Sequence, residues 1–433
     1  MSEVILLSMF IGFLLFFFLT GYPVGYAMGL TSVLLMLFGV GRGVSPELIM
    51  SRMYFGLNSF TLLAIPFFLF AGRIMNVGGM TTRIFAFSNA MVGSLKGGLG
   101  HVNVLASMIF AGMSGLATAD AAGLGAIEYK AMKDGGYPEK YAIGLAGASA
   151  TIGAIFPPSV PTVLYAIVGH LSVGWMLLGG ILPGLVIGGI LMIVVTFQSH
   201  FGQLPRGERF SMKRVVESFG KGFLALLTPV ILIVGIMSGV FTPTEAAAAT
   251  AIYALILALF AYRELSFKGL WQVISDTAID ATVVTVLIGM ASIYGFLVIQ
   301  SRIPVIFAER ILALTQDPLL VMILINVFLL VIGMFLETFA IITIMTPILL
   351  PLITQIGIDP IHFGIVMIFN LQIGLLTPPF GIVLFVLNKA TGLEVSRIIK
   401  GMMPYYFPLV LCLIVLIIFP DVTLWIPRTV FAR

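Results

Sequence analysis

Long uncharged stretches of apolar residues, separated by short polar segments, are the main pattern along this chain. They include Val4–Val40, Leu177–Gln198, Phe223–Thr242 and Met403–Pro420. Each approaches or exceeds the ~20 residues that an α-helix needs to cross the hydrocarbon core of a membrane. Because lipid offers the backbone no hydrogen-bond partners, such stretches are helical. The pattern therefore predicts an all-α polytopic membrane protein.

Composition and charge agree with a membrane location. Hydrophobic residues make up 60% of the 433 and charged residues only 9%, whereas roughly a quarter of the residues in a soluble domain are charged. The mean hydropathy is +1.15. The net charge of +4 does not indicate nucleic-acid binding, because the cations stand in short loops between apolar stretches. The positive-inside rule produces such a distribution.

Several classes of protein are excluded by what the sequence lacks. It has neither a phosphate-binding Gly-x-x-x-x-Gly-Lys loop nor a Gly-x-Ser-x-Gly nucleophile motif. The four histidines show no metal-ligand spacing, and Cys412 is the single cysteine, so neither a metal cluster nor a disulfide is expected. An intramembrane enzyme would need a catalytic dyad or metal pair, which these residues do not assemble. We expect a protein that is not an enzyme and has no organic cofactor.

Two halves of the chain repeat one pattern at a fixed distance. The two Pro-Pro pairs, Pro157-Pro158 and Pro378-Pro379, stand 221 residues apart. The same offset relates three further sets of positions: Gly112-Met113 and Gly333-Met334, Gly136 and Gly357, and Gly153 and Gly374. Single glycines can match at a given offset by chance in a chain with 47 of them. Chance does not explain why the same offset also relates the two proline pairs. The chain is therefore predicted to contain an internal repeat of two halves.

Loop charge indicates which way the two halves face. In the first half the loop Tyr129–Tyr141 carries three lysines, and the next loop, Gly169–Gly174, carries no Lys or Arg. In the second half the order is reversed, since Gln355–Pro360 has no cation and Lys389–Lys400 has three. By the positive-inside rule the halves are inserted in opposite orientations. An inverted repeat of this kind is typical of transporters, whose site lies near the membrane midplane between the halves.

The remaining segments complete a predicted topology with the N-terminus outside. The basic loops Pro205–Lys221 and Arg263–Lys268 belong on the cytoplasmic side. The first pair of spans and its counterpart are predicted at Val4–Thr20, Pro23–Val40, Phe223–Phe241 and Thr244–Tyr262. Two connecting segments are too polar to span and are expected to lie as amphipathic arms along the membrane surface: Ser45–Phe60 and Thr81–Leu95.

Each Pro-Pro pair is expected to break the helix that contains it. Proline lacks an N–H and clashes with the carbonyl group of the preceding turn, and the residue before it is pushed out of the helical region. Gly153 and Gly374 stand shortly before the two pairs. Carbonyl oxygens freed at such breaks can coordinate Na⁺, while the N–H groups of a half-helix can hold an anion. A purely structural proline kink is the alternative.

The segments before the breaks have the length and polarity of re-entrant hairpins. Met113–Lys133 and Phe335–Gln355 each hold several polar residues in apolar surroundings. A carboxylate at the bilayer centre costs at least ~2.5–3.5 kcal/mol unless it is paired or bound to a cation. Asp120 and Glu337 are therefore candidate cation ligands. The alternative, compatible with the first, is that each caps a hairpin helix or meets an arginine.

Three other charged residues are given structural roles. Glu245 follows Thr242-Pro243 and has the pattern of a helix start, with an acid in the first turn. Arg73 and Arg302 end apolar stretches, and their side chains are expected to reach towards the membrane interface.

The sequence as a whole resembles one known family. The most specific segments are Gly239–Ala247, Leu95–Val104 and the two Pro-Pro segments. With them the chain is similar, over essentially its whole length, to the large membrane subunit of TRAP (tripartite ATP-independent periplasmic) transporters, often called DctM.

The resemblance implies a Na⁺-coupled secondary importer of small organic acids in the bacterial inner membrane. It implies an elevator fold, in which a mobile domain of two re-entrant hairpins and two broken helices moves against a scaffold. It also implies two partners, a small four-helix membrane subunit and a periplasmic substrate-binding protein. A stand-alone Na⁺/organic-anion symporter of related inverted-repeat architecture is the alternative.

These predictions assign residues to domains and to sites. The expected domains are 1–95 (scaffold spans and arm), 96–175 (first hairpin and broken helix), 176–315 (scaffold spans and second arm), 316–391 (second hairpin and broken helix) and 392–433 (C-terminal span). The predicted Na⁺ residues are Ser114, Gly115, Thr118, Asp120, Gly153, Glu337, Thr338, Gly374 and Thr377. The predicted substrate residues are Pro157, Pro158, Ser159, Thr162, Thr343, Pro378 and Pro379.

Overall fold

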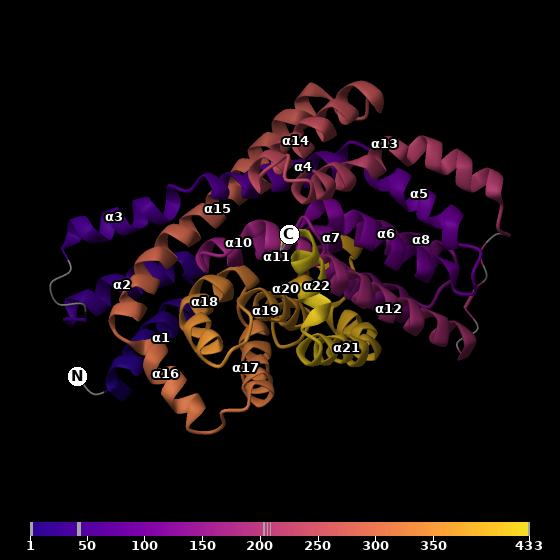
Figure 1. Ribbon diagram of the computed structural model, residues 1–433. Coiled ribbons are helices and arrows are strands. Elements are labelled where there is room, and N and C mark those ends of the chain that lie inside the picture. The colour runs from indigo at the N-terminus through magenta and orange to yellow at the C-terminus, as the bar shows by residue number, and fades with distance from the viewer. Residues whose placement is uncertain (1–2, 41–44, 202–203, 206, 208, 432–433) are drawn as a thin grey trace.

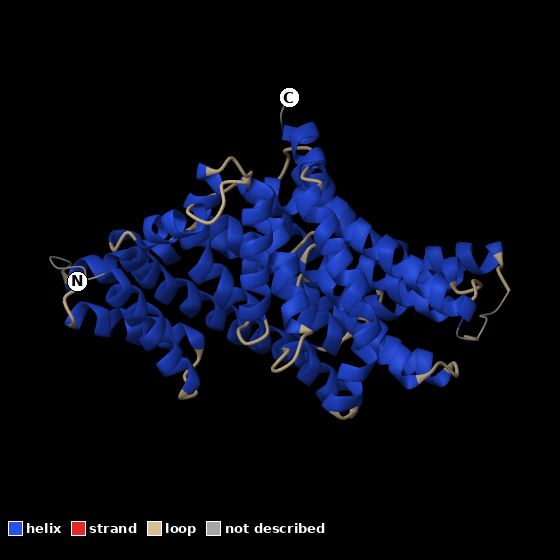
Figure 2. Cartoon of the chain, turned by 90° about the horizontal axis from the view of Figure 1, so that it is seen from below, coloured by secondary structure: helices blue, strands red, loops and turns tan. Residues whose placement is uncertain are grey.

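The protein is a bundle of helices, seen in a computed structural model that describes residues 3–40, 45–201, 204, 205, 207 and 209–431. Every regular element among these residues is a helix, and the molecule is elongated (Figures 1 and 2). Within the described chain, seven helices are long and apolar enough to cross a membrane by length and composition. Shorter apolar helices accompany them. The prediction of an all-α polytopic protein is confirmed.

The first half of the chain forms the helices of the predicted scaffold, followed by a hairpin and a broken helix. The scaffold elements are α1 (Glu3–Leu19), α2 (Val24–Leu37), α3 (Pro46–Leu57), η1 (Phe60–Leu63), α4 (Ala64–Val77) and α5 (Met80–Val92). The hairpin is made by α6 (Gly98–Ser114), α7 (Ala117–Ala122) and α8 (Leu124–Asp134). The broken helix and the elements after it are α9 (Glu139–Ala150), η2 (Thr151–Ala154), α10 (Val160–Val168), α11 (Val173–Gly179) and α12 (Ile181–Phe201).

The second half repeats this order. Its scaffold elements are α13 (Met212–Met237), α14 (Pro243–Ile256), η3 (Leu257–Ala261), α15 (Phe267–Gln300) and α16 (Ile303–Leu312). The second hairpin is made by α17 (Pro318–Gly333) and α18 (Thr338–Gln355). The second broken helix and the elements after it are α19 (Pro360–Leu375), α20 (Ile382–Thr391), α21 (Val395–Ile418) and α22 (Asp421–Phe431).

The 221-residue offset found in the sequence holds for whole elements. Helix α18 begins 221 residues after α7 begins and ends 221 residues after α8 ends. Helix α19 likewise covers the counterpart of α9 together with η2. One difference lies in the arms, because α15 is a single helix whereas its counterpart is divided into α3, η1 and α4. The interruption falls at Asn58-Ser59, where α3 ends.

Two symmetry-related helix pairs join the elements of the predicted scaffold. Helix α4 packs along α14, and α2 packs along α15. The second pair is close at Gly25, where a Cβ would be in ordinary van der Waals contact with the Cα atom of Leu287 (3.5 Å). Both predicted arms are helices: α3 lies along α15, and α5 lies along α13 and α6 (Figure 1).

The two halves interleave at the centre of the molecule. Helix α19 is buried over its whole length from Ile361 to Leu375. After the first break, α10 packs against α18 of the second hairpin. After the second break, α20 packs against α7 of the first hairpin. Each half therefore completes the packing of the other, and neither forms a separate core.

Contacts between loops confirm that the repeat is inverted. Arg397, in the basic loop of the second half, lies 3.6 Å from the carboxylate of Glu139 in the basic loop of the first half. The hydroxyl of Tyr165, just before the uncharged loop of the first half, donates to the carbonyl oxygen of Pro360 in the uncharged loop of the second (3.1 Å). The two basic loops thus lie together, and so do the two uncharged loops. In the first half the basic loop comes before the uncharged loop, and in the second half it comes after it.

Two of the charged residues assigned structural roles have defined partners. Glu245 closes a capping box with Thr242 at the start of α14: its carboxylate accepts from the Thr242 N–H (2.8 Å), and its own N–H donates to the Thr242 hydroxyl. This prediction is confirmed. For Arg73 the expectation was incomplete, because its guanidinium contacts Asp276 and Asp280 on α15 rather than reaching only towards an interface. These contacts join α4 to α15.

Candidate functional site

The tip of the first hairpin contacts the first helix break. Gly115 ends α6 with a left-handed backbone (φ 66°), which glycine adopts without strain. Its carbonyl oxygen accepts from the N–H of Val160, the first residue of α10 (3.2 Å). A Cβ at Gly115 would lie 2.7 Å from the carbonyl oxygen of Pro158. The structure therefore joins two segments that the sequence places more than forty residues apart, the hairpin tip and the Pro-Pro break.

Asp120 and Gly153, both predicted Na⁺ residues, are neighbours. Asp120 is 2% exposed, on the short helix α7. A Cβ added to Gly153 would overlap its carboxylate, so the glycine leaves the space that the carboxylate occupies. Thr118 lies on the same helix and is partly buried. The side chain of Ser114 lies outside the described residues, and that prediction has no structural counterpart here.

The second hairpin meets the second break in a similar way. The N–H of Gly381, at the start of α20, donates to the carbonyl oxygen of Met334 (3.3 Å). Gly381 is the counterpart of Val160 at the 221-residue offset, and Met334 stands two residues before the counterpart of Gly115. Both Pro-Pro peptide bonds are cis.

The predicted Na⁺ residues of the second half gather around this contact. Glu337 is the N-cap residue of α18, although its side chain makes no capping hydrogen bond. The hydroxyl of Thr338, beside it, accepts from the side-chain amide of Gln372 on α19 (3.2 Å). A Cβ at Gly374 would lie 2.8 Å from the Cα atom of Gly333, so α17 and α19 touch backbone to backbone.

Most hydroxyl groups proposed as ligands already bond to the backbone. The Ser159 hydroxyl accepts from the N–H of Thr162 and caps α10. The hydroxyl of Thr162 donates to the Ser159 carbonyl oxygen, and that of Thr377 to the Ile373 carbonyl oxygen, both at 2.7 Å. Thr343 bonds to carbonyl oxygens one turn back. A hydroxyl has two acceptor lone pairs besides its single proton, so Thr162, Thr343 and Thr377 retain acceptor capacity for a cation.

One buried carboxylate in the first hairpin was missed. Glu128, on α8, is 1% exposed. It accepts hydrogen bonds from the side-chain amide of Asn103 (2.6 Å) and the hydroxyl of Ser107 (3.3 Å), both on α6. The sequence could have indicated this residue, since Glu128 is an acidic residue between Ile127 and Tyr129 in the hairpin segment. Only the tertiary structure shows that it lies next to α6.

A cavity of about 1090 Å³ lies between elements of the predicted scaffold and the hairpin regions. It is lined by α3 and α15 on one side and by α10 and α18 on the other. Of the predicted site residues, Thr343 lines this cavity. Of the described lining residues, Arg52 carries a formal charge. The guanidinium of Arg52 lies over the ring of Phe296, 4.6 Å from its centre. The other predicted site residues whose side chains are described do not line this cavity.

The chain matches known proteins over nearly its whole length. Residues 11–422 match the family model described as "Tripartite ATP-independent periplasmic transporter, DctM component". Over 94% of its length the chain is 39% identical to the sialic acid TRAP transporter large permease protein SiaM of Vibrio cholerae, and it covers 95% of that relative. Over 95% of its length it is 38% identical to the 2,3-diketo-L-gulonate TRAP transporter large permease protein YiaN of Escherichia coli, covering 96% of it.

Two further similarities bear on architecture. The sialic acid TRAP transporter permease protein SiaT of Haemophilus influenzae is 36% identical over 94% of this chain, but the chain covers only 66% of that longer relative. A solved structure, the YdaH transporter of Alcanivorax borkumensis, has a TM-score of 0.66 at 14% identity and covers 94% of this chain and 96% of its own. This second similarity shows a shared fold. The relatives described here are named as permeases, and the prediction that the chain is not an enzyme is confirmed.

Proposed function

Since the chain belongs to the DctM component family of tripartite ATP-independent periplasmic transporters, we propose that it imports a small organic acid by coupling to Na⁺. It is a multi-pass protein of the inner membrane. The observation that carries the proposal is the pair of related contacts between hairpin tips and helix breaks, at Gly115 with Val160 and at Met334 with Gly381. A buried or partly buried carboxylate follows each hairpin tip in the chain, Asp120 after Gly115 and Glu337 after Met334. Backbone carbonyl groups together with a carboxylate suit a hard cation.

One Na⁺ would bind at each contact. The first site would use oxygens around Gly115, Asp120 and Gly153, with Ser114 and Thr118 nearby. The second would use oxygens around four residues: Glu337, Thr338, Gly374 and Thr377. Support comes from the burial of Asp120 and from the hydrogen bond that Gln372 donates to the Thr338 hydroxyl, which uses one lone pair of that oxygen and leaves the other for a cation. A bound cation would offset the cost of each carboxylate at membrane depth.

The substrate would be a carboxylate that docks between the two sites. The relatives named above carry sialic acid or 2,3-diketo-L-gulonate, and a further relative in Pseudomonas aeruginosa is named for C4-dicarboxylates. We place the anion at the start of α10, at Ser159 and Thr162 beside Pro157 and Pro158, because N–H groups at a helix start favour negative charge. Pro378, Pro379 and Thr343 would line the opposite side.

Movement would follow an elevator mechanism. The mobile part would comprise α6 to α10 and α17 to α20, and the scaffold would comprise α1 to α5 and α13 to α16. The cavity between α15 and α18 supports this division, because the two parts are incompletely packed there. The driving force would be the Na⁺ gradient together with the membrane potential, which supplies about 2.3 kcal/mol per unit charge per 100 mV.

The transporter would require two further components. We propose a small membrane subunit of four helices and a periplasmic substrate-binding protein. The Haemophilus relative supports the first, because about a third of its length lies outside the match. We propose that this additional part contains the helices of a fused small subunit.

The test is uptake of organic acids by proteoliposomes that contain the three components. We expect uptake with an inward Na⁺ gradient and none when K⁺ replaces Na⁺. Omission of the binding protein should abolish uptake. Unchanged uptake in K⁺ would refute coupling to Na⁺, and unchanged uptake without the binding protein would favour a stand-alone symporter.

A further inference from the structure

A second cavity, of about 970 Å³, lies where three predicted cytoplasmic segments converge. Its lining includes Tyr137 from the first basic loop, residues of the loop that leads into α13, and Glu264 from the loop before α15. The sequence alone places all three segments on the cytoplasmic side. Helix α13 becomes continuously uncharged from Phe223 onwards, so the cavity lies at the cytoplasmic end of that apolar stretch. This is the depth of phospholipid headgroups.

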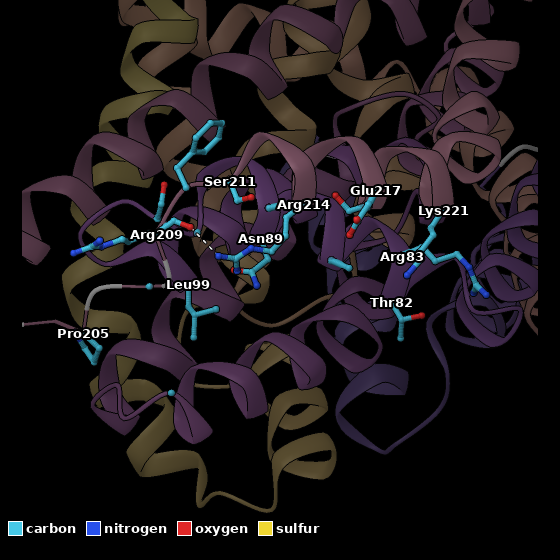
Figure 3. Close-up of a pocket in the computed structure, with 18 of the residues that line it drawn as sticks. Thr82, Arg83, Asn89, Leu99, Pro205, Arg209, Ser211, Arg214, Glu217 and Lys221 are labelled. Atoms are coloured by element: carbon cyan, nitrogen blue, oxygen red, sulfur yellow. Dashed lines mark hydrogen bonds between the residues drawn. The ribbon is translucent and has the colours of Figure 1, made fainter.

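Positive charge dominates this cavity. Among its described lining residues four are cationic, Arg83, Arg209, Arg214 and Lys221, and two are acidic, Glu217 and Glu264. Figure 3 shows Arg83 and Lys221 at one end and Arg209 at the other.

The two acidic groups already have cationic neighbours. Glu264 lies 2.6 Å from Arg83, and Glu217 lies 3.9 Å from Lys213 outside the cavity. Arg214 donates to the carbonyl oxygen of Arg209 (2.8 Å), which draws the loop against α13 (Figure 3). The described lining residues therefore carry a net positive charge, which suits an anion.

The cavity is too large for a small inorganic anion alone, and an apolar surface continues from it. Phe87 on α5 follows the lining residue Ala86 in the chain, and its ring centre lies 5.8 Å from that of Phe219 on α13. Phe219 lies 5.4 Å from Phe223 in turn. Phe219 and Phe223 are each more than 40% exposed, as is Val216. A cationic cavity that opens beside an exposed aromatic stripe matches a molecule with an anionic head and apolar chains.

We propose that this cavity binds the headgroup of an anionic phospholipid, with its acyl chains along Phe219 and Phe223. The headgroup would lie in the cavity between its two cationic ends, which hold Arg209 and Lys221, and the hydroxyl group of Ser211 or Ser218 would donate to its oxygens. Basic pockets at the cytoplasmic ends of membrane helices recognise such headgroups. Because α5 and α13 belong to the scaffold, the lipid would join an arm to a span. The inference is independent of the transported substrate.

Native mass spectrometry of the full-length chain, titrated with phosphatidylglycerol or phosphatidylcholine, tests the proposal. We expect preferential binding of phosphatidylglycerol, and a loss of about fivefold in its affinity for Lys221→Gln and for Arg209→Gln, as expected for one cation near a membrane surface. Lys268→Gln is the matched control: Lys268 is exposed on the same predicted side but lies outside the cavity, and its replacement should leave lipid binding unchanged.

Three outcomes would overturn the proposal. The first is equal affinity for the two lipids, or wild-type affinity in both cavity variants. The second is displacement of phosphatidylglycerol by millimolar inorganic phosphate, which would indicate a site for a soluble anion. The third is loss of the bound lipid when the small membrane subunit is purified together with the chain, which would indicate a protein interface.

Discussion

Gly153 is the residue whose replacement should most directly disturb the first Na⁺ site. An added methyl group would overlap the carboxylate of Asp120, and overpacking of this kind costs about 1–3 kcal/mol. We predict that Gly153→Ala lowers the thermal unfolding midpoint of the purified protein and reduces Na⁺-driven uptake.

Gly189→Ala provides the control for this substitution. Gly189 lies in α12 with nothing within 4 Å of an added Cβ, and alanine is the better helix former. This variant should be at least as stable as the wild type. Equal unfolding midpoints for the two alanine variants would contradict the packing of Asp120 against Gly153.

Asp120 should determine the Na⁺ dependence of transport. We predict that Asp120→Asn raises the Na⁺ concentration for half-maximal uptake about tenfold or more, since the loss of about 1.4 kcal/mol of binding free energy has that effect. Asp134→Asn is the matched control, because Asp134 is exposed at the end of the same hairpin. A parallel change in both variants would show a general effect of charge instead of a ligand role.

At the scale of one element, the capping box of α14 contributes to stability by a local mechanism. Thr242→Ala removes the side-chain oxygen that accepts from the Glu245 N–H, and loss of such a cap costs about 1 kcal/mol. We predict a lower unfolding midpoint for Thr242→Ala and a nearly unchanged one for Thr242→Ser, which keeps the hydroxyl. If serine were as destabilising as alanine, the methyl contact of the threonine would be the cause.

The hairpins show which features of the helices could be predicted from the sequence. Their existence followed from the 221-residue offset and from polar residues inside apolar stretches. Two short helices were expected in each run; the first run forms α7 and α8, divided at Gly123, whereas the second forms the single helix α18. Helix α18 continues although it contains Pro347 and Pro351. Packing on both sides of a buried helix decides such details, and local propensity does not.

At the scale of the whole molecule, the inverted topology predicts which loops are reached from each side of the membrane. Cys412 is the single cysteine of the chain, so Cys412→Ala gives a clean background for labelling. Asp134→Cys and Glu394→Cys should react with a membrane-impermeant maleimide only from the cytoplasmic side, and His170→Cys and Gln355→Cys only from the periplasmic side. All four positions are exposed. Asp134 and Gln355 occupy corresponding positions in the two halves. Labelling of Asp134→Cys and Gln355→Cys from the same side of the membrane would refute the inversion.

The elevator proposal predicts that a covalent link between scaffold and mobile part stops transport. A Cβ at Gly295 on α15 would lie 4.0 Å from the Cβ of Pro347 on α18, close to the spacing of a disulfide. We expect oxidation of the Gly295→Cys, Pro347→Cys pair to abolish uptake, and reduction to restore it.

The pair Gly25→Cys, Leu287→Cys is the control for this link. A Cβ at Gly25 would lie 3.9 Å from the Cβ of Leu287, and both residues lie in the scaffold. Oxidation should leave uptake unchanged here. Full uptake in both oxidised pairs, with disulfide formation verified, would mean that α15 and α18 do not separate during transport.

The sequence by itself determined the membrane-spanning helical class, the repeat and its inversion, because these depend on local quantities: the length of apolar stretches, the spacing of proline pairs and the charge of single loops. It also located Asp120, Glu337 and both breaks. Only the tertiary structure decided which of them meet. The contacts of Gly115 with Val160, of Asp120 with Gly153 and of Arg73 with α15 join residues distant in the chain. Such contacts arise because the two halves complete each other's packing, which no local pattern records.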